Sequence, residues 1–166
     1  MNPSCNATTT PGGLVVINGS GVLLQGKSGT GKSDLTLQLL DRGHQLVADD
    51  VVEIAVDETL VIGRAPTRLR GHMEIRGLGP CLVEALFGPE ALREQAAVSL
   101  VITLERPTDW STWPRLAPEA DHVGLAGITV PRVRLPVGPE RPLALVVEAV
   151  ARLHTCGQLQ SETEHA

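Results

Sequence analysis

Short runs of apolar residues recur along this chain and predict more strands than helices. Residues 14–17 and 22–25 are apolar runs on either side of Asn18-Gly19, which is a strong signal for a β-hairpin turn. Residues 45–48 form another short apolar run, and residues 98–104 have the length and composition of a buried central strand. Strands therefore dominate the first two thirds of the chain.

Two further strand pairs follow from alternation and turn residues. Residues 51–56 and 60–62 are extended in character and flank Asp57-Glu58-Thr59, a turn sequence. Residues 123–137 alternate weakly and contain Pro131 and Pro136, which suits edge strands because proline lacks a ladder N–H. Since the strands do not alternate regularly with helices, we expect an α/β fold with a mixed β-sheet.

Helical spacing occurs at two places. Leucines at i and i+4 predict a helix over residues 34–42, with Gly43 at the position that favours a C-terminal glycine. A second helix is predicted from Leu143 to Leu153, with Pro142 in its first turn and Gly157 just beyond its end. Residues 82–87 predict one or two helical turns, whereas residues 64–80 predict a long loop without a clear period.

The chain is organised as one domain without internal repeats. Its 166 residues suit a single core. We expect a loose tail over residues 1–13, a domain over residues 14–157, and a polar tail over residues 158–166.

A glycine-rich segment stands between the predicted strand 22–25 and the predicted helix 34–42. It fits the pattern G-x-x-x-x-G-K-[ST] at every fixed position and reads Gly26, Lys27, Ser28, Gly29, Thr30, Gly31, Lys32, Ser33. Strand, glycine-rich loop and helix N-terminus form the context that defines a P-loop, in which backbone N–H groups and the helix dipole hold phosphate oxygens. Lys32 is expected to reach the β- and γ-phosphates, and the Ser33 hydroxyl to bind Mg²⁺.

An acidic pair follows the next predicted strand. Asp49 and Asp50 lie where P-loop proteins place a carboxylate, although so short a spacing after the P-loop favours a compact kinase over a large ATPase. Adjacent side chains on a strand point to opposite faces, so one aspartate is expected to face the phosphates while the other does something else. Such a carboxylate can bind metal or accept a proton from an attacking hydroxyl.

Composition and charge exclude several classes of function. The net charge of −5 lacks the basic surface of a general nucleic-acid binder, and one Phe and two Trp provide few surfaces for base stacking. Three cysteines without a C-x-x-C motif indicate neither a zinc site nor a disulfide framework. The sequence shows neither a membrane-spanning apolar run nor the layout of a signal peptide, so we expect a cytoplasmic protein with no membrane partner.

Three segments together resemble the bacterial HPr kinase/phosphorylases. They are residues 26–33, residues 42–50 (Arg-Gly-His-Gln-Leu-Val-Ala-Asp-Asp) and residues 73–79 (Met-Glu-Ile-Arg-Gly-Leu-Gly), the last of which is similar to the signature of that family. The resemblance covers roughly residues 14–153 and implies the catalytic domain in a short form without the separate N-terminal domain. It also implies a P-loop fold related to phosphoenolpyruvate carboxykinase, and typically a homo-hexamer.

The resemblance implies a reaction and a set of residue roles. Members of the family use ATP and Mg²⁺ to phosphorylate a serine of HPr, a phosphocarrier of the sugar phosphotransferase system, and many also remove that phosphate with inorganic phosphate. Lys32 would be the catalytic lysine, Asp49 the base and Arg115 the catalytic arginine. The metal ligands would be Ser33, Glu74 and Asp50. Arg76, Gly77 and Arg141 would belong to loops that contact the substrate.

The sequence departs from the family pattern at two places. Pro11 stands where the family has a catalytic histidine, and residues 136–142 replace a basic residue by Gly138, a glycine by Glu140 and an asparagine by Pro142. A carboxylate beside a phosphate site would repel the attacking anion. We therefore expect kinase activity with weak or absent phosphorylase activity. Two alternatives remain open at this point: a kinase for a small hydroxylated metabolite, and a non-catalytic nucleotide-binding sensor.

Overall fold

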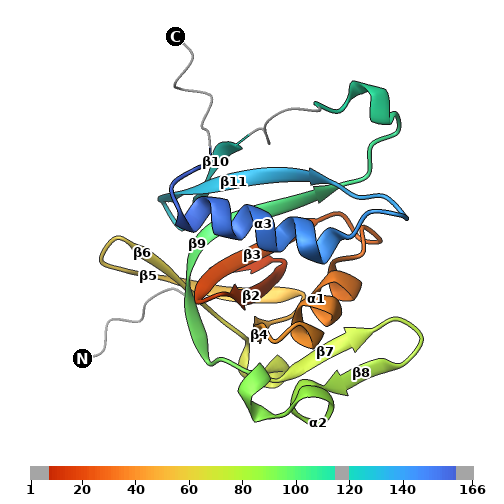
Figure 1. Ribbon diagram of the computed structural model, residues 1–166. Helices are drawn as coiled ribbons and strands as arrows, with labels where there is room; N and C mark the ends of the chain where they lie inside the picture. The colour runs from red at the N-terminus through yellow and green to blue at the C-terminus, as the bar shows by residue number, and fades with distance from the viewer. Residues whose placement is uncertain (1–7, 115–119, 160–166) are drawn as a thin grey trace.

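The computed structural model describes residues 8–114 and 120–159. Its framework is a nine-stranded mixed sheet (Figure 1). Seven of its strands lie in the order β1-β5-β6-β9-β3-β2-β4. The other two are β11, which also pairs with β9, and β10, which pairs with β11. The strands run as follows: β1 (Thr8–Pro11), β2 (Gly13–Ile17), β3 (Ser20–Gly26), β4 (Gln45–Ala48), β5 (Val51–Asp57), β6 (Leu60–Arg64), β9 (Gln95–Glu105), β10 (Ala120–Leu125) and β11 (Ile128–Pro136). A separate hairpin pairs β7 (His72–Ile75) with β8 (Gly79–Leu82). The predicted α/β fold with a mixed sheet is confirmed.

The described residues also contain three α-helices: α1 (Lys32–Asp41), α2 (Val83–Phe87) and α3 (Leu143–Thr155). Both longer helices contribute to one apolar cluster that lies against one face of the sheet, with Leu35 and Leu39 from α1 and Val147 from α3. The opposite face has its own cluster, which includes Leu14 and Val16 of β2. Strand β2 is therefore buried on both faces, and its side chains alternate between the two clusters.

Strand β9 joins the two halves of the sheet. Its first residues pair antiparallel with β6, and its later residues pair parallel with both β3 and β11. Gly26, the last residue of β3, lies opposite Leu104 near the end of β9, so the chain leaves both strands at the same edge. That edge carries the P-loop, as expected for ligand sites at the carboxyl ends of parallel strands.

Most of the predicted elements are confirmed. The Asn18-Gly19 turn joins β2 and β3 with both residues at positive φ, and Glu58 takes positive φ in the turn between β5 and β6. The predicted helices correspond to α1, α2 and α3, with Gly43 and Gly157 at positive φ beyond the ends of α1 and α3.

Three expectations differ from the structure. The predicted tail 1–13 contains β1, whose residues Thr8–Pro11 pair with β5. The predicted long loop 64–80 contains a 3₁₀ turn and most of the β7–β8 hairpin; its alternation of buried Met73 and Ile75 with exposed neighbours is only four residues long and is hidden among Gly, Arg and Pro. The third is β11, which is an interior strand that pairs with both β10 and β9. Its ladder to β9 begins at Arg132, after Pro131, so the missing N–H of that proline is not needed there.

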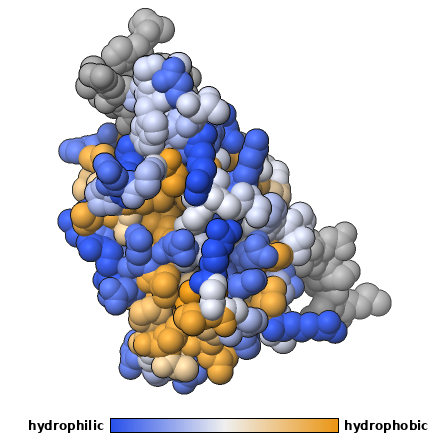
Figure 2. All heavy atoms as spheres, turned by 90° about the vertical axis from the view of Figure 1, so that its right-hand side faces the viewer, coloured by the Kyte–Doolittle hydropathy of each residue, from blue (hydrophilic) through white to orange (hydrophobic). Residues whose placement is uncertain are grey.

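Apolar side chains also reach the surface at one end of the molecule. Figure 2 shows them over the end that carries β7, β8 and α2 in Figure 1, where Leu78, Leu82 and Leu86 are exposed. Across residues 8–114 and 120–159, no helix has both the length and the apolar character needed to cross a bilayer.

A cluster of charged side chains ties the last helix to α1 and β4. Arg42 donates to both carboxylate oxygens of Glu148 at 2.6 and 2.7 Å, and His44 Nε2 lies 2.7 Å from Glu148 Oε1. The Glu148 side chain is only 12% exposed. The hydrogen bonds from Arg42 lower the pKa of Glu148 from 4.5 to about 2, against the opposing effect of burial.

Replacing Glu148 by Gln is expected to lower the free energy of unfolding at pH 7 by about 1–2 kcal/mol, because it removes a charged acceptor from Arg42. A lowered pKa in the folded state contributes stability above the unfolded value and loses it as the pH falls. The gap between wild type and variant should therefore close between pH 4.5 and about 2. Urea unfolding at several pH values measures it, with Glu140→Gln, at an exposed site, as the control. If the difference in unfolding free energy between wild type and Glu148→Gln does not change with pH, the charged Glu148 carboxylate is not the source of that difference.

Candidate active site

The P-loop occupies the turn between β3 and α1, as predicted. Thr30 closes it through two bonds to the Lys27 carbonyl, one from its backbone N–H at 3.2 Å and one from its hydroxyl at 2.8 Å. Gly26 is required here, because its φ is +156° and a Cβ would lie 2.9 Å from the Leu104 carbonyl oxygen. Gly31, also at positive φ, precedes the first turn of α1. The backbone is thus arranged to bind an anion at a helix N-terminus.

Lys32 lies across this loop. Its Nζ donates to the Gly26 carbonyl at 2.7 Å and to the Lys27 carbonyl at 3.3 Å. The ammonium group is thereby held at the mouth of the loop, where a phosphate chain would replace carbonyl oxygens as its partner.

A cavity of about 760 Å³ opens in front of the P-loop. The P-loop residues that line it are Gly26, Ser28, Gly29, Gly31, Lys32 and Ser33; those from the acidic corner and the signature segment are Asp49, Asp50, Glu74, Ile75, Arg76, Gly77 and Gly79. Three segments distant in sequence therefore meet at one cavity. Lys27 and Thr30, which the motif also included, do not line it.

Both aspartates line this cavity, contrary to the expectation that they point to opposite faces. The reason is local backbone geometry. Residues 49–50 form a bend between β4 and β5 instead of continuing a strand, and Asp50 takes positive φ (+68°). Bonds from Val51 N to the Asp49 carbonyl (2.8 Å) and from Gly12 N to the Asp50 carbonyl (2.9 Å) hold the bend. The strand rule therefore does not apply to this pair.

Asp49 contacts the signature segment directly. Its Oδ2 accepts a hydrogen bond from the backbone N–H of Glu74 at 3.0 Å. Burial raises the pKa of Asp49 above its usual range, the Glu74 N–H opposes this, and the negative charges of Asp50 and Glu74 raise it further. A carboxylate with a raised pKa at the edge of the P-loop cavity is suited to accept a proton.

The side chains suited to a divalent cation are Ser33, Asp50 and Glu74, all of which line the cavity. Within the described part of the chain, no three His, Cys, Asp or Glu residues form a ready metal cluster. This donor set fits Mg²⁺, which in phosphate-transfer sites uses one or two carboxylates and completes its shell with substrate phosphates and water.

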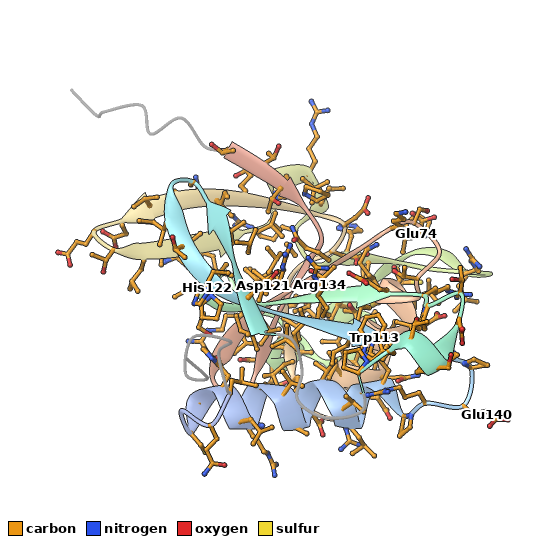
Figure 3. All side chains as sticks on the ribbon, turned by 90° about the horizontal axis from the view of Figure 1, so that it is seen from above. Glu74, Trp113, Asp121, His122, Arg134 and Glu140 are labelled. Carbon is orange, nitrogen blue, oxygen red and sulfur yellow. The ribbon has the colours of Figure 1, made fainter. Side chains whose placement is uncertain are left out.

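Among the described residues, Arg141 and Glu140 do not line the main cavity. Arg141 lines a second cavity, described below, and Arg115 falls outside the described residues. Glu140 lines neither cavity; it is exposed and lies at the outer edge of the molecule, away from Glu74, in Figure 3. The expected carboxylate beside a phosphate site is therefore not found at Glu140.

Sequence reasoning missed one charged residue that lines the cavity. Arg106 lines both cavities, and the available signal was its place directly after the strand that pairs parallel with the P-loop strand. Pro11, which stands where the resemblance places a histidine, does line the main cavity.

Comparison with known proteins agrees with the geometry. The family described as the HPr Serine kinase C-terminal domain matches residues 4–165. The HPr kinase/phosphorylase of Thermoanaerobacter sp. (strain X514) is 40% identical over 158 residues, which are 95% of this chain and 52% of that protein. The HPr kinase/phosphorylase of Limosilactobacillus reuteri (strain DSM 20016) is 42% identical over 156 residues, 92% of this chain and 49% of that protein.

A solved structure gives the same answer. The HPr(Ser) kinase/phosphatase from Coxiella burnetii superposes with a TM-score of 0.84 at 36% identity, covering 90% of this chain and 92% of that one. This chain spans about half the length of the curated relatives it matches. The family match extends over nearly the whole sequence, and the P-loop, the aspartate pair and the signature segment meet at one cavity. The chain belongs to the HPr serine kinase C-terminal domain family.

Proposed function

We propose that this domain is an ATP-dependent protein-serine kinase whose acceptor is HPr or an HPr-like phosphocarrier. The observation that carries the proposal is the arrangement of Lys32, Asp49 and Glu74 around one cavity in front of a P-loop. The names of the relatives support the acceptor, since they are HPr kinase/phosphorylases. The presence of Lys32, Asp49 and Glu74 together argues against a nucleotide sensor without catalytic activity.

The geometry supports a division of roles. The P-loop N–H groups and Lys32 would hold the β- and γ-phosphates. Asp49 would accept the proton of the serine hydroxyl as its oxygen attacks the γ-phosphorus, and ADP would leave with the displaced electron pair. Mg²⁺, held by Ser33, Glu74 and Asp50, would neutralise phosphate charge. Arg115 is proposed to stabilise the transferring phosphoryl group, on the resemblance alone.

The surroundings of the site extend the proposal. Arg76 and Gly77 lie in the turn between β7 and β8 and line the cavity, which supports the proposal that this turn contacts the protein acceptor. A homo-hexamer and a cytoplasmic location are proposed from the family resemblance.

Transfer of label from [γ-³²P]ATP tests the acceptor directly. With Mg²⁺ and the HPr of the same organism, label should appear on a serine of HPr, whereas free serine at millimolar concentration should remain unlabelled. Labelling of serine but not of HPr would favour a small-molecule kinase. ATP binding without transfer to either acceptor would contradict the enzymatic proposal.

The reverse reaction is expected to be weak. The basis is Pro11, which places no titratable group at the cavity wall where the family resemblance places a histidine. The same preparation, given phospho-HPr and millimolar inorganic phosphate, should release little pyrophosphate. Release at a rate close to that of the forward reaction would show that Pro11 does not limit the phosphorylase reaction.

A further inference from the structure

A second cavity of about 330 Å³ adjoins the first. The two share three lining residues, Gly31, Asp34 and Arg106, so a ligand bound at the P-loop can extend from one into the other. One wall of the second cavity is the first half of α1, and the other is the connection between β11 and α3.

The second cavity has both apolar and polar lining residues. Leu35, Val137, Pro139 and Leu143 supply apolar surface, while Gln38 and Arg141 supply hydrogen-bonding groups. Apolar surface beside hydrogen-bonding groups suits a flat heterocycle with polar edges better than it suits a bare phosphate.

Arg141 provides an independent indication of a ligand. Its Nε is buried and has no hydrogen-bond partner among the described residues. A buried N–H without an acceptor is costly and uncommon in folded proteins. Arg141 also lines the second cavity, so its guanidinium group is within reach of a ligand bound there.

Two charged side chains mark the boundary between the cavities. Arg106 follows β9 at the edge where the P-loop begins, and it forms no ion pair with any described residue. Asp34, in the first turn of α1, is exposed there. A cation beside a P-loop suits phosphate oxygens, and a carboxylate suits the hydroxyls of a ribose.

Gly138 shapes the outer wall. A Cβ at this position would lie 2.6 Å from Cζ2 of Trp110, so the glycine allows the indole to lie against the loop. Trp110 is thereby placed beside the cavity, where its fluorescence can report on occupancy.

We propose that the second cavity binds the nucleoside end of the nucleotide. The base lies between α1 and the 137–143 connection and contacts the guanidinium group of Arg141. Asp34 lies at the ribose, and Arg106 binds the phosphates that bridge the two cavities. The inference rests on the proposed function, because it extends the same nucleotide site, and it assigns specific roles to Arg106 and Arg141.

Calorimetric titration with two probes, MgATP and magnesium tripolyphosphate, separates the two ends of the site. Arg141→Met should weaken MgATP binding by about tenfold and leave tripolyphosphate binding within about threefold. Arg106→Gln should weaken both by about tenfold. Gln38→Trp, a substitution on an exposed helix face that leaves the core unchanged, should obstruct the cavity and weaken MgATP alone. Arg152→Gln, exposed on α3, is the matched control and should change neither.

Each of the other outcomes is decisive. If Arg141→Met weakens the binding of both probes equally, Arg141 is a phosphate ligand and the nucleoside assignment is overturned. Unchanged MgATP binding in both Arg141→Met and Gln38→Trp would also overturn that assignment. A wild type that binds tripolyphosphate as tightly as MgATP would overturn it as well, while leaving the P-loop site in place. Binding of neither probe by the wild type would instead reject the proposed function itself. Trp110 fluorescence gives a second readout, measured in Trp113→Phe so that Trp110 is the one remaining tryptophan. MgATP should quench this fluorescence, and tripolyphosphate should leave it unchanged.

Discussion

Asp49→Asn is expected to lower the rate of phosphoryl transfer by about 10²–10⁴-fold, because an amide cannot accept the proton of the serine hydroxyl. The asparagine oxygen can still accept the hydrogen bond from Glu74 N that Asp49 Oδ2 now accepts at 3.0 Å. Binding of MgATP should therefore stay close to wild type, and the loss should appear in kcat. Labelled transfer to HPr measures the rate, and calorimetry measures the affinity.

The pH dependence of the wild type provides the companion result. Because burial raises the pKa of Asp49, the acid limb of the rate profile should lie above the usual range of an aspartate. A pKa raised in the folded state contributes stability below the unfolded pKa, and that contribution is lost as the pH rises through the folded pKa. Asp49→Asn, which carries no charge, should therefore be more stable than the wild type at pH 7.

The control for these experiments is Asp57→Asn, at the exposed end of β5, which should leave rate, affinity and stability near wild type. Transfer by Asp49→Asn within a few-fold of wild type would show that another group accepts the proton. Lower stability of that variant at pH 7 would contradict the effect of burial on the charged form.

Lys32→Ala is expected to reduce transfer by about 10²–10³-fold and to weaken MgATP binding, because it removes the one ammonium group that lines the described cavity. It also leaves the Gly26 carbonyl without its side-chain donor, whereas the Lys27 carbonyl keeps its bond from the Thr30 hydroxyl. Both effects act on the loop that holds the phosphates.

Lys27→Ala is the matched comparison, because these are the two lysines of the chain and they lie in the same loop. The Lys27 side chain is exposed and does not line the cavity, so its loss should cost a few-fold at most. Transfer assays and MgATP titrations of both variants decide the assignment. Equal losses would show that general positive charge near the loop, and not the position of Lys32, supports the reaction.

Much of the fold was predictable because the responsible interactions are local. The Asn18-Gly19 turn, the strand before the P-loop and the leucine spacing of α1 each depend on residues within one or two turns of chain. The signature segment was the exception. Its β7–β8 hairpin is short, and it is formed by pairing that local composition does not reveal, so residues 64–80 resembled a loop.

The candidate site was likewise predictable from the sequence only where its features are local. The P-loop, Lys32 and the acidic pair were found from motif and spacing, whereas the contact of Asp49 with Glu74 joins residues 25 positions apart. The common orientation of the two aspartates also required the structure, because it depends on the positive φ of Asp50 at a corner that Gly12 holds.

By itself, the sequence determined the anion-binding loop, because glycine spacing and a helix start specify its backbone from within eight residues. Only the tertiary structure decided what surrounds that loop. Parallel pairing of β3 with β9 brings Arg106 beside the phosphate cavity, and the packing of α3 against α1 brings Arg141 to the adjoining one. The physical reason is that these approaches depend on burial of apolar faces from strands and helices far apart in the chain, which no local pattern encodes.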